Sequence, residues 1–181
     1  MIKPAFILKN LFSDEEIKKI KDTIFTQSSK KETINLEMPI DIDDNTNKIY
    51  SLMGRLDVEK IKFEKLIIDK IEKTLNELYP NKRFYIGNKD IISSTYSRLY
   101  GKPGLSEHKD GGFPLQIIVD YQLDSNTSWN IEVDGKEYEI ENNDALVFDP
   151  VLSSHSRPKK VFSSDDYVTM VYFRGRVEEK K

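Results

Sequence analysis

From residue 83 onward the chain consists of short apolar segments separated by turn residues, and no long helical pattern interrupts them. The segments are rich in β-branched and aromatic residues, which favour strands. They are RFYIG, IISSTYSRLY, FPLQIIVDYQL, SWNIEV, KEYEI, DALVFD and DYVTMVYFRG. Parallel strands need long crossover connections, usually helices, and none is available here. Residues 83–176 are therefore predicted to form an antiparallel sandwich or barrel.

Two turn signals support this prediction. The pair Asp134-Gly135 lies between alternating segments in IEVDGKEYEI, the pattern of a tight two-residue hairpin. ENND, residues 141–144, predicts another turn, in which asparagine can adopt a positive φ.

Residues 1–82 have a different character and, after a first apolar run AFILKNLF that predicts a strand, predict a helical region packed outside the sheets. Ser13 and Glu16 form a capping box at the start of one amphipathic helix. Apolar residues at helical spacing predict a second helix from Asp57 to Leu78, which ends before Pro80. The polar stretch 27–50 between the two helices is our candidate for a lid loop.

Composition restricts the functions that the chain can have. Its 181 residues suit a single domain, 1–181. With 28 Lys and Arg against 31 Asp and Glu, we expect no nucleic-acid partner. The absence of cysteine excludes disulfides, thiolate nucleophiles and cysteine-based zinc sites. MIKPAFILKNLFSDEE predicts neither a signal peptide nor a membrane span, so we expect a cytoplasmic protein.

The chain has only two histidines, His108 and His155, and both fall in the β-rich part. If the backbone is extended, His108 and Asp110 point to the same side. His155 begins a later predicted strand. Two imidazoles and one carboxylate with the remaining positions open form the metal site of non-haem Fe(II) oxygenases. A solvated charged turn is the alternative interpretation of the His-x-Asp pair.

At this point the sequence resembles a family. SRLYGKPGLSEHKDGG and NNDALVFDPVLSSHSRP are similar to the two metal-binding segments of 2-oxoglutarate and Fe(II)-dependent dioxygenases, especially the prolyl-4-hydroxylase-like branch. The resemblance covers residues 84–174. It is greatest to a bacterial subgroup in which Trp129 to Ile131 lies between the motifs and Arg157 follows the distal histidine.

The resemblance implies an α+β, mainly β fold, a double-stranded β-helix (jelly roll) with the N-terminal helices on the outside of one sheet. It implies a hydroxylase that uses Fe(II), 2-oxoglutarate and O2, and it also admits ascorbate. His108, Asp110 and His155 would be the metal ligands. The carboxylate at position 110 implies hydroxylation rather than halogenation.

One departure from the family concerns the co-substrate. A basic residue about ten positions after the distal histidine usually holds the far carboxylate of 2-oxoglutarate, but this chain has Ser164, Asp165 and Asp166 there. Arginine suits a carboxylate because its planar fork can donate two hydrogen bonds. Our candidates, in order of preference, are Arg157, then Arg98 with Tyr100, then Arg174.

Each candidate has a structural alternative. Arg157 could belong to a solvated basic cluster with Lys159 and Lys160, and Arg98 could pair with an acid. Trp129, the only tryptophan, is expected in the core rather than in a substrate site.

Two other functions also remain open. The missing basic residue would suit a cupin-like isomerase or an oxygenase that needs no 2-oxoglutarate, and a non-catalytic binding module could keep the same fold. The substrate, a small molecule or a peptide side chain, and the oligomeric state are beyond the sequence.

Overall fold

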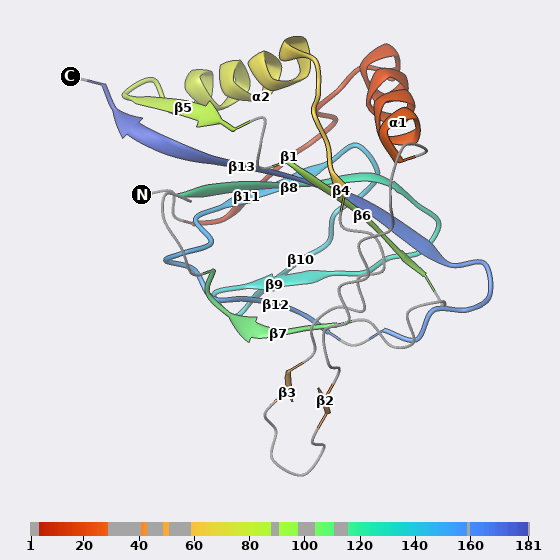
Figure 1. Ribbon diagram of the computed structural model, residues 1–181. Coiled ribbons are helices and arrows are strands. Elements are labelled where there is room, and N and C mark those ends of the chain that lie inside the picture. The colour runs from red at the N-terminus through yellow and green to blue at the C-terminus, as the bar shows by residue number, and fades with distance from the viewer. Residues whose placement is uncertain are drawn as a thin grey trace.

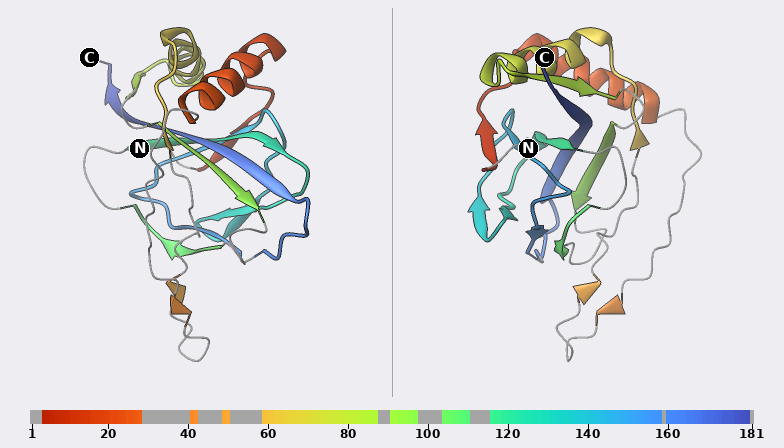
Figure 2. Two further views of the ribbon diagram at one scale, coloured as in Figure 1. Left: turned by 45° about the vertical axis from the view of Figure 1, so that its right-hand side comes forward. Right: turned by 90° about the vertical axis from the view of Figure 1, so that its left-hand side faces the viewer.

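Two β-sheets pack against each other in the computed structural model, and two helices cover the outer face of the larger sheet (Figures 1 and 2). The structure describes residues 4–28, 41–42, 49–50, 59–87, 91–97, 104–110, 116–158 and 160–180. All of the strand pairs are antiparallel, so the predicted mainly β architecture with helices outside one sheet is confirmed.

The larger sheet has the order β1-β11-β8-β13-β6-β4, and β5 also pairs with β13. Its strands are β1 Phe6–Leu8, β4 Glu59–Lys60, β5 Lys82–Ile86, β6 Ile92–Ser97, β8 Ile117–Ser125, β11 Ala145–Phe148 and β13 Tyr167–Glu179. The smaller sheet has the order β10-β9-β12-β7. Its strands are β7 Leu105–His108, β9 Ile131–Val133, β10 Lys136–Tyr138 and β12 His155–Arg157. The N-terminal region therefore also contributes strands, β1 and β4, to the larger sheet.

Both predicted turns are confirmed. Asp134 and Gly135 join β9 to β10 and have φ of 50° and 74°. Two positive φ values match the twist of a tight two-residue hairpin. Asn143 has φ of 70° in the turn before β11.

Helix α1, Asp14–Ser28, begins as its capping box predicts. The Ser13 backbone N–H and hydroxyl donate to Glu16 at 2.8 and 3.0 Å, and the Glu16 N–H reaches the Ser13 hydroxyl at 3.4 Å. The helix includes residues 27 and 28, which we had assigned to the lid loop. Of the rest of that loop the structure describes only β2, Asp41–Ile42, and β3, Ile49–Tyr50, which pair with each other.

Helix α2, Lys65–Leu78, ends as predicted but begins later than the predicted Asp57. Ile61 and Phe63 are both buried, and the Ile61 N–H donates to the carbonyl of Ile91 at 3.1 Å. This stretch is therefore extended. Residues 57 and 58 lie outside the described part of the chain. Within that part, neither helix has the length and apolar composition that crossing a bilayer requires.

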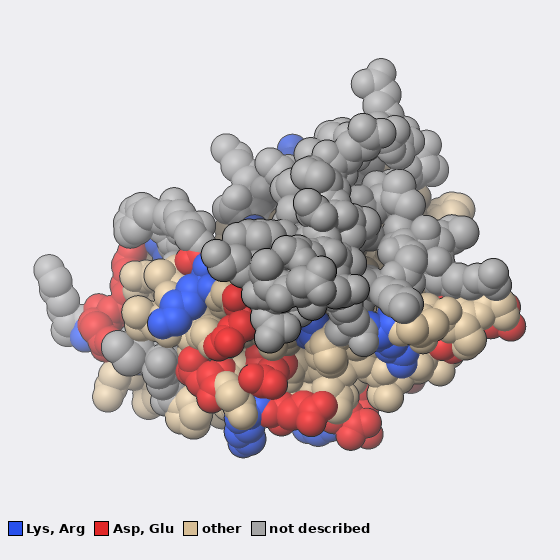
Figure 3. Space-filling view, turned by 90° about the horizontal axis from the view of Figure 1, so that it is seen from below, with Lys and Arg blue, Asp and Glu red and all other residues tan. Residues whose placement is uncertain are grey.

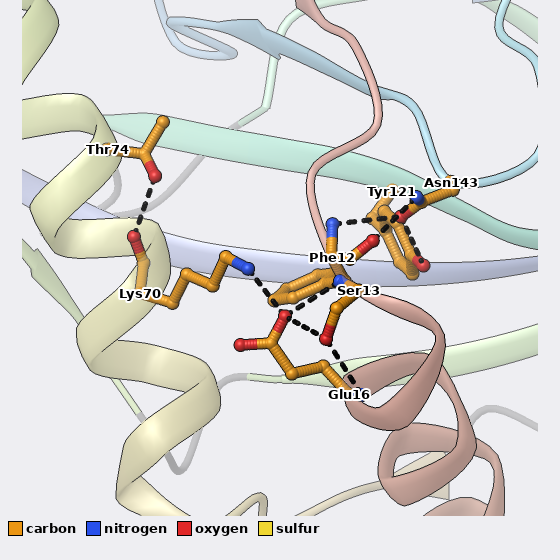
Figure 4. A network of polar contacts seen from close by, with 7 residues as sticks. All are labelled: Phe12, Ser13, Glu16, Lys70, Thr74, Tyr121 and Asn143. Atoms are coloured by element: carbon orange, nitrogen blue, oxygen red, sulfur yellow. Dashed lines mark hydrogen bonds and ion pairs between the residues drawn. The ribbon is translucent and has the colours of Figure 1, made fainter.

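A polar network ties the start of α1 to its surroundings (Figure 4). Glu16 accepts from Lys70 of α2 at 2.5 Å in addition to Ser13. Asn143, in the turn before β11, accepts from the Phe12 N–H at 3.0 Å and donates to the Phe12 carbonyl at 2.8 Å. The network therefore holds both helices to the larger sheet.

The larger sheet separates two apolar clusters, and β13 shows the division most simply. Val171 and Phe173 face the helices and join one cluster, whereas Met170 and Tyr172 face the smaller sheet and join the other. Because side chains alternate along a strand, a single strand supplies both. The candidate site lies at the edge of the second cluster.

Candidate metal centre

The two histidines and Asp110 come together although His155 lies far along the chain from the other two residues. Asp110 Oδ1 is 3.3 Å from His108 Nε2 and 3.7 Å from His155 Nε2. One ligand atom from each of the three residues lies within 4.8 Å of the others. The structure thus brings together the three residues that the sequence suggested as ligands, and their role is taken up below.

Strand pairing explains the arrangement. His108 ends β7, His155 begins β12, and the two are paired directly opposite each other, so both rings project from the same face. Their centroids are 4.2 Å apart. Asp110 follows β7, and its N–H donates to the carbonyl of Pro150 at 2.8 Å, which holds the carboxylate beside the rings.

The turn before β12 sets the orientation of His155. Asp149 accepts hydrogen bonds from the N–H groups of Val151 and Leu152, each at 3.1 Å. His155 Nδ1 lies 3.4 Å from the Ser153 carbonyl oxygen. Since a carbonyl can only accept, this contact favours the tautomer with the proton on Nδ1, in which the Nε2 lone pair faces Asp110.

The charges of the site favour a deprotonated donor set. Burial would raise the pKa of Asp110, but the hydrogen bond to His108 and the nearby His155 and Arg174 outweigh it and lower that pKa. Burial, followed by the nearby His108, lowers the pKa of His155. The site thus offers one carboxylate and a neutral imidazole at neutral pH.

This donor set fits a divalent transition metal such as Fe(II). Two imidazoles and one carboxylate leave further coordination positions for other ligands. The side chain of His155 is 6% exposed and that of His108 is 35% exposed, so one side of the set is buried and the other opens to solvent. Ligand bonds of about 2 Å would require only small inward shifts of the three side chains.

A second polar group lies between the sheets, deeper than the histidines. Arg157, two residues after His155 on β12, is buried at 3% exposure, so it does not belong to a solvated basic cluster. Its Nη2 donates to Asp120 Oδ2 at 3.2 Å and its Nη1 to the carbonyl of Trp129 at 2.7 Å. Its guanidinium also lies over the Trp129 ring, 4.9 Å from the centroid. Trp129 itself is buried in the second apolar cluster, as expected.

The remaining candidates for co-substrate binding differ in position. Arg174 on β13 is partly buried, its charge acts on both Asp110 and Asp120, and its Nε has no hydrogen-bond partner within the described ranges. Arg98 and Tyr100 lie outside the described residues. Asp165 is exposed and Asp166 is half-buried, and Asp166 accepts from the Ser163 N–H in a turn.

Our sequence prediction missed Asp120. This residue lies in β8 and is 2% exposed. An acid within the otherwise apolar run IIVDYQL could have revealed it, because a buried carboxylate needs a cation or donors nearby. The sequence did not indicate which cation that would be.

No family model and no curated protein matches the chain. Solved structures do match it. A Pseudomonas putida prolyl-4-hydroxylase is 10% identical with a TM-score of 0.55, over 95% of this chain and 92% of that one. A Trichoplax adhaerens prolyl hydroxylase, solved with a hypoxia inducible factor peptide fragment, is 13% identical with a TM-score of 0.59, over 94% and 83%. A Burkholderia pseudomallei oxidoreductase of the 2OG-Fe(II) oxygenase family is 10% identical with a TM-score of 0.59, over 95% and 85%.

These similarities extend over nearly the whole chain. They show that the chain has the fold of prolyl hydroxylases and related 2OG-Fe(II) oxygenases, so the resemblance expected from the sequence is confirmed at the level of the fold. Because the identities are low, the activity is argued from the site.

Proposed function

We propose that this protein is a non-haem Fe(II) and 2-oxoglutarate-dependent oxygenase that hydroxylates an unactivated C–H bond. The observation that carries the proposal is the convergence of His108, Asp110 and His155 within 4.8 Å in a fold shared with such oxygenases. We further infer that the two sheets are the halves of a double-stranded β-helix, which the strand orders of the larger and smaller sheets support.

In this proposal each residue of the site has a definite role. The Nε2 atoms of both histidines and the Asp110 carboxylate would hold Fe(II) on one side and leave the exposed side for the other reactants. When bound, Fe(II) with 2-oxoglutarate and O2 supplies the oxidising chemistry, in which the oxo acid yields succinate and CO2 and one oxygen atom is inserted into the C–H bond. The apolar cluster beside His155, including Phe148 with its ring 5.0 Å away, would exclude water from the buried side.

Arg157 is our first candidate to hold the distal carboxylate of 2-oxoglutarate. It points into the space between the sheets from the same strand as His155, and Trp129 fixes its orientation. Arg174, whose Nε has no hydrogen-bond partner among the described residues, is the competing candidate. Replacing Arg157 with leucine should weaken 2-oxoglutarate binding far more than Fe(II) binding. Unchanged affinity in Arg157→Leu and loss in Arg174→Leu would reverse the assignment.

One observation favours a second function. Arg157 is already neutralised by Asp120, and this would suit a metal-binding jelly roll that does not use 2-oxoglutarate. An anaerobic titration separates the two proposals. Metal-free protein is given Fe(II) and then 2-oxoglutarate, and the visible charge-transfer band of an iron-chelated oxo acid is recorded. We expect the band in the wild type and its absence in Asp110→Ala. Iron binding without the band would favour the second function.

A further inference from the structure

The guanidinium that we assign to the co-substrate is occupied by one of the protein's own carboxylates. Asp120 and Arg157 come from β8 and β12, in different sheets, and are 2% and 3% exposed. A single hydrogen bond of 3.2 Å joins them. An arginine and a carboxylate can form two parallel bonds, so this pair uses only part of its capacity.

The pair is also incompletely satisfied. Asp120 Oδ1 is enclosed and has no hydrogen-bond partner within the described part of the chain. Most buried polar atoms in proteins are paired, because an unpaired one keeps the cost of losing water. A purely structural ion pair would be expected to satisfy both carboxylate oxygens. The geometry is instead that of a carboxylate held loosely enough to be displaced.

The surroundings of Asp120 determine what happens when it is displaced. On β13, Tyr172 lies directly opposite and Arg174 follows on the same face. The hydroxyls of Tyr172 and Tyr96 of β6 form a hydrogen bond of 2.9 Å. On β11, the residue paired with Asp120 is the apolar Leu146. From β12, Arg157 and His155 act on it. A bare carboxylate would be costly here once Arg157 turned away.

Protonation removes that cost. Burial raises the pKa of Asp120, although Arg157, His155 and Arg174 all act in the opposite direction. Arg157 contributes to the opposing effect both through its charge and through its hydrogen bond. Without that hydrogen bond the carboxyl would become still easier to protonate.

We propose that Asp120 determines co-substrate specificity by competing, as an internal carboxylate, with the distal carboxylate of the oxo acid for Arg157. In the exchange, the hydrogen bond from Arg157 to Asp120 breaks and one from Arg157 to the oxo acid forms. Asp120 takes up one proton from solvent, and no covalent bond other than this O–H changes. This inference rests on the proposed function and on Arg157 as the anchor.

The test compares two oxo acids that share their metal-chelating end. 2-Oxoglutarate has the distal carboxylate, and 2-oxopentanoate has a methyl group in its place. Their affinities for anaerobic Fe(II)-loaded protein are measured from the charge-transfer band between about pH 6 and pH 8.5. Because one proton is taken up, the dissociation constant for 2-oxoglutarate should rise by up to about tenfold per pH unit relative to that for 2-oxopentanoate.

The variant Asp120→Asn keeps the shape of the side chain but removes the competing charge. We expect it to bind 2-oxoglutarate about tenfold tighter at pH 8 than the wild type does, to lose the pH dependence specific to that ligand, and to leave 2-oxopentanoate unchanged. Asp144→Asn is the matched control, because Asp144 is also 2% exposed and also paired with a cation, Lys9, away from the site. It should change neither affinity.

Three results would overturn the inference. Weaker 2-oxoglutarate binding by a folded Asp120→Asn would make Asp120 a positioning residue for Arg157. Equal pH dependence for the two oxo acids would show that no proton is exchanged at the distal end. If the variant does not fold, calorimetry of the wild type in two buffers of different ionisation enthalpy decides, and equal proton uptake for both ligands refutes the exchange. By contrast, a wild type that binds Fe(II) but gives no band with either oxo acid refutes the proposed function itself.

Discussion

The two faces of the larger sheet are buried against different neighbours and have different chemistry. The face under α1 and α2 packs a cluster that is hydrophobic throughout, centred on residues such as Ile20, Leu75 and Phe173. The face toward the smaller sheet is also apolar, but Asp120, His155 and Arg157 are buried within or beside it. The comparison indicates that the helix-covered side mainly stabilises the fold, whereas the side between the sheets accepts costly buried charges for function.

The outer face of the smaller sheet differs from both of these faces. Acidic side chains are prominent on the side of the molecule seen in Figure 3. Glu107, Glu132 and Glu137 of β7, β9 and β10 are exposed. The polar residues of this sheet therefore divide by face, with solvated acids outside and the histidines and Arg157 inside.

The strongest test of this difference between the two faces of the larger sheet removes the carboxylate of the proposed metal centre. Asp110→Ala should lower the slow, substrate-independent conversion of 2-oxoglutarate to succinate by at least about a thousandfold, because the proposed metal site loses its carboxylate side-chain ligand. The free energy of unfolding should change by less than about 1 kcal/mol, since Asp110 forms no part of either apolar cluster. Succinate release and urea unfolding measure the two effects.

Glu107→Ala is the control, because Glu107 lies on β7 only three residues before Asp110 but is exposed. Its turnover should equal that of the wild type. Full activity in Asp110→Ala would show that the carboxylate is not a ligand.

Adjacent residues of β13 permit a second test, because they face opposite sides. Phe173 is fully buried under the helices, with its ring 5.6 Å from that of Phe63. Phe173→Ala should therefore lower the free energy of unfolding by about 3–5 kcal/mol. Tyr172→Phe removes only a hydroxyl bonded to Tyr96 and should cost about 1 kcal/mol.

For co-substrate affinity the order is reversed, and Tyr172→Phe should have the larger effect. Tyr172 faces Asp120, so Tyr172→Phe should change the affinity for 2-oxoglutarate, whereas folded Phe173→Ala should keep it. Urea unfolding and the charge-transfer titration provide the two readouts. A large loss of affinity in Phe173→Ala would mean that the two faces are energetically coupled.

The sequence predicted the features that depend on neighbouring residues, and it failed where contacts between residues distant in the sequence decide the structure. The capping box at Ser13 and the Asp134-Gly135 hairpin were predictable because they depend on neighbouring residues. The His-x-Asp spacing placed His108 and Asp110 together for the same reason. The predicted start of α2 was wrong because Glu59 and Lys60 pair with β6 as strand β4 and the Ile61 N–H donates to the Ile91 carbonyl, tertiary contacts that override helical periodicity.

The partner of Arg157 could not be predicted from local pattern. Asp120 lies 37 positions away, and only the packing of the two sheets brings it close. Identifying Asp120 as the partner of Arg157 therefore required the structure, and the binding experiments above choose between Arg157 and Arg174 as the proposed anchor.

The smallest predicted effect concerns the network that fixes the helices to the sheet. Burial would raise the pKa of Glu16, but its hydrogen bonds with Lys70 and Ser13 outweigh burial and lower it. The stabilisation by Glu16 is therefore fully present above the ordinary glutamate pKa of 4.5 and is lost as the pH falls through the lower value in the folded state. Glu16→Gln should lower the free energy of unfolding at pH 7 by about 1–2 kcal/mol.

This difference from the wild type should shrink as urea unfolding is repeated below pH 4.5. Glu15→Gln is the matched control, because Glu15 lies in the same turn with an exposed pair to Lys19 and should cost less than about 0.5 kcal/mol. Since Glu16 contacts only the helix-covered side, neither variant should alter the affinity for Fe(II) or 2-oxoglutarate. A pH-independent loss in Glu16→Gln would show that its charge does not contribute to stability, and altered co-substrate binding would show that the helices help to shape the site.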